Sequence, residues 1–210
     1  PIILALLLNE IRVKWFKRVT QTLLYLPHFL SWVVIGATAY AMFATNSGVI
    51  NTLIANAGKS PIPFLQEDAW WLFSYILIGI WQTMGWGTII YLAAITNVNS
   101  ELYEAAKVDG ANRWQQCLHV TLPCIRSTIV VMLIMQLGKL MGGSFERIVA
   151  LSNAKATEYT TTIPVLVFKW FQGNKFSEST ALGLFQSVIG VILVVASDKI
   201  AKKLGEDGLL

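Results

Sequence analysis

Five charged residues lie in one short stretch between two long apolar segments: Glu101, Glu104, Lys107, Asp109 and Arg113. Glu104 is followed by two alanines, whose small side chains let another backbone approach closely. An exposed carboxylate beside such a small patch suits an ion pair with a basic partner, and a short helix in a partner's groove is an established recognition mode. These residue types therefore indicate a protein-docking helix.

The sequence lacks complete motifs for nucleotide binding, metal binding or a disulfide framework. Gly58-Lys59-Ser60 resembles the end of a phosphate-binding loop, but Leu53 stands where that loop needs its first glycine. His28 and His119 have no companions at metal-ligand spacing. The two cysteines, Cys117 and Cys124, are too few for a disulfide framework, and we expect both to be packed thiols. We predict no metal site, no cofactor in this chain and no enzymatic activity.

The composition places the chain among membrane proteins. Of its 210 residues, 55% are hydrophobic and 13% are charged, and the mean hydropathy is +0.58. Four apolar windows approach the ~20 residues that a helix needs to cross a bilayer: residues 22–45, 71–96, 122–142 and 179–198. Their backbone groups must be satisfied within the segment, so we predict helices. The opening run, PIILALLL, is too short to span alone, and we expect the chain to begin partway through a longer protein.

The distribution of lysine and arginine predicts the orientation in the membrane. Ten basic residues lie before residue 22, in residues 97–126 and in the C-terminal tail. Five lie in residues 46–70 and 143–178: Lys59, Arg147, Lys155, Lys169 and Lys175. The positive-inside rule therefore places the charged connection in the cytoplasm. The net charge of +4 is explained by this asymmetry, and we predict no nucleic-acid partner.

Helix-boundary residues predict the structure of the loop at about residues 97–121. Ser100 can cap a first helix, and Gly110 can end it because glycine adopts the backbone conformation needed to turn. Asn112 can cap a second helix, with Gln115 three residues on as in a capping box. Pro123 suits the first turn of the next membrane helix.

The same stretch carries a longer pattern: Glu104-Ala105-Ala106, three residues, Gly110, nine residues, then Val120-Thr121-Leu122-Pro123. It resembles the EAA loop of ABC importer permeases and departs from the family's Ile-any-Leu-Pro ending only at Val120. The segments PIILALLLNEI and ALGLFQSVIGVILV resemble the oligosaccharide and polysaccharide branch. The resemblance implies an all-α, polytopic type I importer permease fold. Residues 1–210 would form one permease domain without its N-terminal part, with about five membrane helices, the first one partial.

The resemblance also implies a coupling surface and partners. The surface that docks on a cytoplasmic ATPase would comprise Glu104, Ala105, Ala106, Asp109, Gly110, Leu122 and Pro123. Two ATPase subunits would bind ATP and Mg, and a second, homologous but non-identical permease would complete the pathway. An external binding protein would deliver the solute, an oligosaccharide, at the bacterial cytoplasmic membrane.

Polar residues inside the predicted membrane helices are candidates for the solute path, because such residues are costly in lipid. Gln82 lies about 18 Å into its helix at 1.5 Å per residue, near mid-membrane. The path candidates are Gln82, Thr83, Trp86, Gln136 and Lys139, with Gln186 in the last window. Alternatively, the glutamines bond neighbouring helices or the second permease, and Lys139 reaches out to the membrane surface.

Two other functions remain open at this point. An ion-coupled secondary transporter is expected to carry an acidic residue at mid-membrane, and none lies deep in the four windows. A membrane scaffold would keep the polar residues without transporting a solute. Residues 143–178 mix aromatic and charged side chains, and we expect them to contact an external partner.

Overall fold

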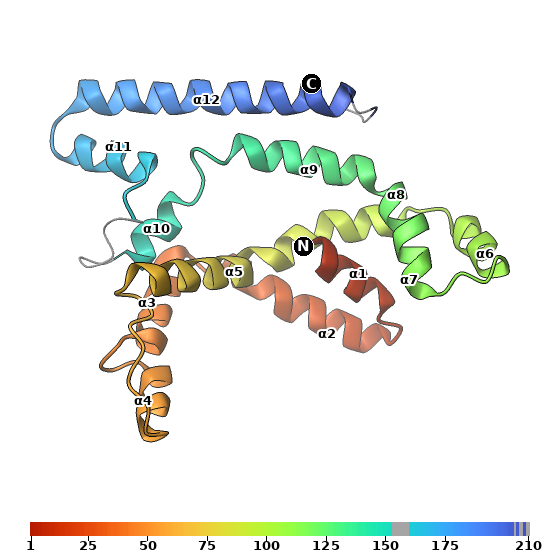
Figure 1. The fold of residues 1–210 in the computed structure, drawn as a ribbon, viewed down its shortest axis with the longest axis horizontal. Helices are drawn as coiled ribbons and strands as arrows, with labels where there is room; N and C mark the ends of the chain where they lie inside the picture. The colour runs from red at the N-terminus through yellow and green to blue at the C-terminus, as the bar shows by residue number, and fades with distance from the viewer. Residues whose placement is uncertain (153–159, 204, 206–207, 209–210) are drawn as a thin grey trace. The chain divides into compact units, whose positions relative to one another are not determined.

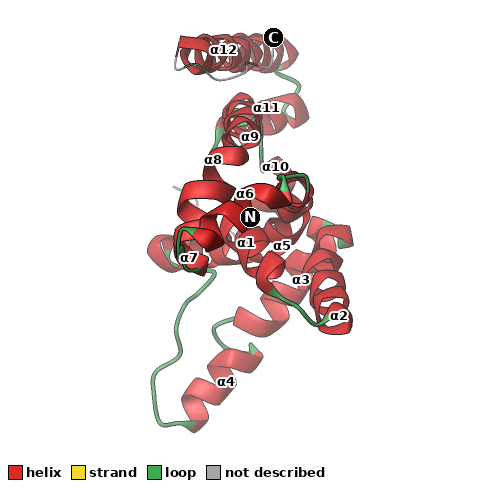
Figure 2. Cartoon of the chain, turned by 90° about the vertical axis from the view of Figure 1, so that its right-hand side faces the viewer, coloured by secondary structure: helices red, strands yellow, loops and turns green. Residues whose placement is uncertain are grey.

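The structure is a computed structural model that describes residues 1–152, 160–203, 205 and 208 (Figure 1). Helices and loops account for these residues, none of which forms a strand (Figure 2). The chain divides into two compact units. Unit 1 comprises Pro1–His28, Thr83–Gly138 and Ile192–Leu210, and unit 2 comprises Phe29–Gln82 and Lys139–Val191. The predicted all-α class is confirmed.

Among the described residues, two helices are long and apolar enough to cross a membrane. They are α5, Asp68–Thr96, and α12, Phe176–Lys203, and they cover two of the predicted windows. Only 6% of the most apolar part of α12 is buried within the chain. Its exposed apolar side chains are suited to contact with lipid or with another subunit.

The other two windows are broken helices. In the window at 22–45, α2 (Lys14–Tyr25) ends in a 3-10 turn, Leu26–Phe29, and α3 (Trp32–Phe43) begins after Ser31. Pro27 lacks a backbone N–H, and Ser31 caps α3 by accepting a hydrogen bond from Val34 N at 3.4 Å. The expectation of one continuous helix in this window is therefore wrong.

The window at 122–142 is also interrupted. It begins in α8 (Leu122–Cys124), continues in α9 (Arg126–Gly138) and ends in turns. The helical stretches Arg113–Cys124 and Arg126–Gly138 meet at an angle of 63°. If each broken pair counts as one span, the described residues contain up to four spans. With the short α1 (Ile2–Glu10), this agrees with part of a polytopic permease fold.

Unit 1 is built where α1 meets the second half of α5 and the start of α9. Its buried core is formed by Ala5, Tyr91, Ile95 and Ile125. On α1, Ala5 and Leu8 are buried because they lie three residues apart on one helix face. The unit also contains the loop elements α6 (Ser100–Val108), α7 (Arg113–Gln116) and the π-helical turn η2 (Cys117–Thr121).

Unit 2 packs α3 and α10 (Phe145–Leu151) against the first half of α5. Its core consists of Ile35, Ala39, Trp71, Ile78 and Leu151. Trp71 Nε1 donates a hydrogen bond to the carbonyl of Leu151 at 2.7 Å, which ties α5 to the end of α10. A Cβ at Gly36 would overlap the backbone of Ala150, so glycine allows α3 and α10 to approach closely.

Unit 2 also holds α4 (Val49–Asn56) and α11 (Ile163–Gln172). The described residues of the predicted outer segment at 143–178 thus include α10, α11 and the start of α12. Lys155, one of the basic residues used to predict the orientation, lies outside the described residues.

Candidate functional site

The first helix of the charged loop, α6, is capped by Asn99. Asn99 Oδ1 accepts a hydrogen bond from the backbone N–H of Glu101 at 3.0 Å. Ser100 is instead the first helical residue, so the predicted cap was one residue too late. Asparagine caps as well as serine does, and the extended backbone at Asn99 places its side chain over the first turn.

The turn after α6 depends on Gly110, as predicted. Gly110 has φ +81°, a left-handed conformation that side chains disfavour. Its N–H donates to the carbonyl of Lys107 at 3.0 Å, and the N–H of Ala111 donates to that of Ala106 at 2.8 Å. These two bonds are those of a Schellman motif and satisfy carbonyls that the end of a helix leaves open. A Cβ at position 110 would contact nothing within 4 Å, so the backbone angle alone demands glycine.

The second helix of the loop begins with the predicted capping box. Asn112 Oδ1 accepts from the N–H of Gln115 at 2.9 Å, and Gln115 Oε1 accepts from the N–H of Asn112 at 2.8 Å. The reciprocal pair satisfies two backbone donors at the start of α7. The helix therefore has a defined first residue, close behind the turn at Gly110.

A π-helical turn carries this second helix into α8. The N–H of Leu122 donates to the carbonyl of Cys117, five residues back. Pro123 lies in the first turn of α8, as predicted, where its missing N–H leaves no donor unsatisfied. The chain bends at Ile125, so the helical stretch from Arg113 continues one residue beyond Pro123, to Cys124, before α9 begins.

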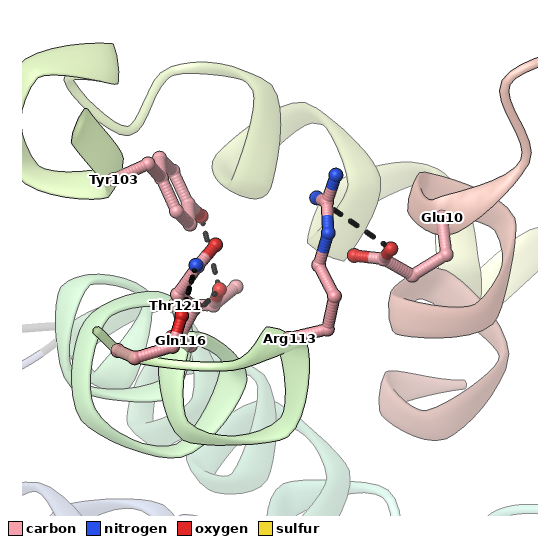
Figure 3. A network of polar contacts seen from close by, with 6 residues as sticks. Glu10, Tyr103, Arg113, Gln116 and Thr121 are labelled. Carbon is pink, nitrogen blue, oxygen red and sulfur yellow. Dashed lines mark hydrogen bonds and ion pairs between the residues drawn. The ribbon is translucent and has the colours of Figure 1, made fainter. Parts of the chain in front are cut away.

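Three side chains that the sequence analysis did not single out connect the two loop helices (Figure 3). Tyr103 Oη of α6 lies 3.0 Å from Thr121 Oγ1 of η2. Thr121 Oγ1 donates to the carbonyl of Gln116 at 3.4 Å, and Gln116 Nε2 donates to the carbonyl of Ala111 at 2.8 Å. Gln116 and Thr121 are 5% and 4% exposed, whereas Tyr103 is half-buried. Of the three bonds, the one between Tyr103 and Thr121 holds α6 against η2.

An ion pair connects this loop to α1. Arg113 Nη1 lies 3.7 Å from Glu10 Oε2, but both side chains are more than half exposed (Figure 3). Such an exposed pair adds about 0–1 kcal/mol of stability. The ion pair therefore contributes little to fixing the position of α7 against α1.

A pocket of about 830 Å³ lies between α1 and the loop helices within unit 1. Its apolar lining comes from Ile2, Ile3, Leu6 and Leu7 of α1 and from Trp114, Leu118 and Leu122 of the loop helices. Its polar wall includes Glu10, Glu104, Lys107 and Arg113. The pocket therefore presents charged groups of both signs beside an apolar surface, which suits a protein contact better than a small ion.

The predicted coupling residues gather in this part of unit 1. Glu104, Ala105 and Asp109 are exposed and Ala106 is half-buried, so the motif side of α6 is largely accessible. On α8, Leu122 is half-buried and Pro123 is exposed. Glu104 and Leu122 line the same pocket, whereas Ala105, Asp109 and Pro123 do not line it.

The predicted path residues are spread over several elements. Gln82 is buried on α5, while Thr83 and Trp86 of the same helix are exposed. Gln136 is exposed on α9, and exposed Lys139 follows the end of that helix. The structure thus gives only Gln82 an enclosed position.

Trp86 has a structural contact that the sequence did not indicate. Its ring stacks on that of His28 with a centroid distance of 4.5 Å and an interplanar angle of 7°. At Gly85 a Cβ would overlap the carbonyl of Leu24, so this glycine lets the end of α2 lie against α5. His28 and Trp86 therefore fix this helix contact within unit 1.

The two cysteines and His119 differ in their exposure to solvent. Cys117 is half-buried, but Cys124 is exposed, so the expectation of two packed thiols is wrong for Cys124. His119 is exposed and its Nδ1 lies 3.0 Å from the carbonyl of Gln115. Among the described residues, no three His, Cys, Asp or Glu side chains gather as a metal site would require.

Comparison with known proteins gives one consistent family. The sequence model of the family described as "Binding-protein-dependent transport system inner membrane component" matches residues 1–204. The polygalacturonan/rhamnogalacturonan transport system permease protein YteP of Bacillus subtilis is 46% identical over all 210 residues, which cover 65% of that protein. Protein LplB of the same species is 41% identical over the whole chain and is covered to 66%. The chain thus spans less than two thirds of the length of either relative.

Solved structures resemble the whole chain. One is the crystal structure of a bacterial alginate ABC transporter in complex with an alginate pentasaccharide-bound periplasmic protein. The matching chain has a TM-score of 0.95 and 35% identity, and the match covers 100% of this chain and 73% of that one. A second, of a bacterial ABC transporter involved in the import of the acidic polysaccharide alginate, has a TM-score of 0.93 over 97% of this chain.

Proposed function

Because the chain belongs to the family of binding-protein-dependent transport system inner membrane components, we propose that it is a permease subunit of an ATP-driven importer. A solute delivered by an external binding protein crosses the bacterial cytoplasmic membrane through it by alternating access. The multi-pass arrangement is supported by two unbroken candidate spans and two broken ones.

The proposed cargo is an oligosaccharide. This is supported by relatives named for the transport of polygalacturonan/rhamnogalacturonan and of arabinooligosaccharides. It is also supported by the similar transporter that was solved with an alginate pentasaccharide-bound periplasmic protein. The chain itself makes and breaks no covalent bond in this proposal. ATP and Mg are bound by separate ATPase subunits.

The proposed partners are two cytoplasmic ATPase subunits, a second permease subunit that is homologous but not identical, and the binding protein. The similar structure solved with a periplasmic protein supports the last of these. Membrane lipid surrounds the assembly, and no nucleic acid takes part.

The observation that carries the coupling role is the bond between Tyr103 and Thr121, which holds α6 against the helix leading to α9. A displacement of α6 is therefore transmitted to η2 through this partly buried hydrogen bond. Glu104 provides an ionic contact with the ATPase, and Ala105 and Ala106 provide a close fit. Asp109 and Gly110 end the docking helix, and Leu122 and Pro123 continue the path toward the membrane helix.

Two alternatives to an importer subunit are an ion-coupled secondary transporter and a scaffold without transport. An ion-coupled transporter has no use for a capped, exposed helix held rigidly to a membrane helix. A scaffold would not respond to solute. Stimulation of ATP hydrolysis by solute-loaded binding protein, tested as described next, distinguishes an importer subunit from both alternatives.

The proposal is tested by ATP hydrolysis of the assembled complex in lipid, with and without binding protein and candidate sugars. We expect loaded binding protein to stimulate hydrolysis. Glu104→Ala should reduce the stimulation about two- to fivefold, as expected for an exposed ion pair of up to ~1 kcal/mol. Gly110→Asp should abolish it, because it strains the left-handed turn and adds a second carboxylate beside exposed Asp109 on the docking surface.

Glu101→Ala is the matched control, since it removes a carboxylate from the same helix at a position that does not line the pocket. An equal loss of stimulation in Glu101→Ala and Glu104→Ala would overturn the assigned role of Glu104. A chain that associates with no ATPase would overturn the importer.

A further inference from the structure

Arg147 of α10 lies among aromatic rings in unit 2. Its Cζ is 3.9 Å from the ring centroid of Tyr75 on α5 and 5.7 Å from that of Trp32 on α3. Tyr75 in turn stacks on Trp71 at 5.0 Å with an interplanar angle of 22°. Trp71 is 2% exposed and fixed by its bond to Leu151, so the aromatic wall around the guanidinium is rigid.

The guanidinium is only partly satisfied by its neighbours. Nη2 donates to Tyr75 Oη at 2.7 Å and to Ser144 Oγ at 3.0 Å, and both acceptors are neutral. Nε is buried and has no hydrogen-bond partner. No ion pair of Arg147 with a carboxylate occurs within the described part of the chain. A permanent charge in such surroundings is costly unless an anion binds it.

The backbone is shaped to hold this group. A Cβ at Gly79 would overlap Arg147 Nη1, so α5 makes room for the guanidinium by having glycine there. Ser144 has φ 76°, a left-handed conformation that is uncommon outside glycine. Strained residues of this kind gather at ligand sites, and here the strain brings a hydroxyl to Arg147.

We propose that Arg147, with Tyr75 and Trp32, binds the carboxylate of an acidic sugar unit during its passage. A guanidinium binds carboxylates in a planar, two-donor geometry that a lysine does not offer. The carboxylate would take the Nε donor and replace the neutral Ser144 hydroxyl on Nη2. Tyr75 is covered by Trp71 and by Arg147 and would only hold the guanidinium in place, whereas the ring of Trp32 would pack on the sugar. This inference rests on the proposed function and narrows its cargo to uronate-containing oligosaccharides.

The other basic residues that the structure describes in unit 2 have no comparable surroundings. Lys169 is exposed in the last turn of α11, and none of the ring contacts of the described residues involves it. It therefore provides a control that removes one positive charge from the same unit without touching the aromatic site.

The test is equilibrium binding of labelled tetragalacturonate and of its full methyl ester to the assembled complex in lipid, without binding protein. The two probes differ only in their carboxylates. We expect the wild type to bind the acid more tightly than the ester. Arg147→Gln should weaken acid binding roughly tenfold to a hundredfold, as for a lost hydrogen-bonded charge, and leave ester binding nearly unchanged. Lys169→Gln should bind both probes as the wild type does.

If the Arg147→Gln complex does not assemble, Arg147→Lys provides the test of carboxylate binding, because lysine keeps the charge and most of the volume. We expect it to weaken acid binding several-fold and ester binding little. Equal wild-type affinity for acid and ester overturns the inference, as does acid binding that the Arg147 variants leave unchanged or that Lys169→Gln reduces equally. If loaded binding protein still stimulates ATP hydrolysis in that case, the proposed function stands. Absence of stimulation by any sugar counts against the proposed function itself.

Discussion

Tyr103 Oη lies 3.0 Å from Thr121 Oγ1, and this contact connects the exposed docking helix α6 to the π-helical turn that leads into the membrane segment. Thr121 is almost fully buried and Tyr103 is half-buried, so the bond is partly shielded from competition with water. Motion of α6 therefore has a direct path to η2 that does not depend on the exposed ion pair between Glu10 and Arg113.

Removing this contact should uncouple transport from ATP hydrolysis. Tyr103→Phe and Thr121→Val each delete one hydroxyl, and a typical hydrogen bond contributes about 0.5–1.5 kcal/mol. We expect each variant to import fewer sugar molecules per ATP than the wild type, measured in proteoliposomes. Thr121→Val also removes the bond to the carbonyl of Gln116, so the double variant should be no worse than Thr121→Val alone. Fully additive losses would show that the two hydroxyls act independently.

The capping box at Asn112 should stabilise the start of the second loop helix, α7. Asn112→Ala removes the side-chain acceptor at the start of α7 and should destabilise that helix by about 1 kcal/mol. The consequence is faster tryptic cleavage after Arg113, measured by mass spectrometry. Asn112→Ser keeps a capping oxygen and serves as the control. Equal cleavage rates for the Asn112→Ala and Asn112→Ser variants would contradict a role for the cap in ordering the loop.

Two glycines with positive φ allow a matched comparison. Gly110 has φ +81° and Gly58 has φ +74°, and a Cβ at either position would meet nothing within 4 Å. Alanine at either site should cost about 1–2 kcal/mol of local backbone strain. We expect Gly110→Ala to reduce solute-stimulated ATP hydrolysis and Gly58→Ala to leave it close to the wild-type value. A similar loss of stimulated ATP hydrolysis in both variants would mean that the strain lowers the stability of the whole protein and does not act on the coupling loop specifically.

A comparison of variants at His28 and Trp86 tests whether Trp86 of α5 has a role in transport in addition to its structural role. His28→Ala and Trp86→Ala both remove the ring contact and should destabilise the complex to a similar degree, measured as detergent-resistant assembly. If Trp86 also lines the solute path, Trp86→Ala should lower the uptake rate further than His28→Ala does. We expect this larger loss, because Trp86 is 46% exposed despite the stack. Identical uptake by the two variants would remove Trp86 from the path.

Local signals in the sequence predict most of the loop, because its caps and turn depend on neighbouring residues. Asn112, Gln115 and Gly110 all act over a few residues, and the structure has them as predicted. The break near Pro27 was missed because apolar composition alone does not show where a helix ends. Pro27 and Ser31 together carried the signal that could have located it.

Contacts between distant segments could not be predicted from one sequence. Tyr103 and Thr121 are 18 residues apart, and Arg147 and Tyr75 are 72 apart. Neither pair is marked by periodicity, because tertiary packing alone brings each together. The long-range apolar cores depend in the same way on the close approach allowed at Gly36 and Gly85.

The most direct test of the account is uptake of a labelled oligosaccharide into proteoliposomes that contain the assembled complex, with ATP restricted to the side on which residues 97–121 are predicted to lie. We expect uptake that requires ATP on that side and loaded binding protein on the other. Uptake should persist when ion gradients are collapsed and should be lost in Gly110→Asp. Uptake that continues without ATP and stops when the ion gradient is collapsed would contradict the proposed function.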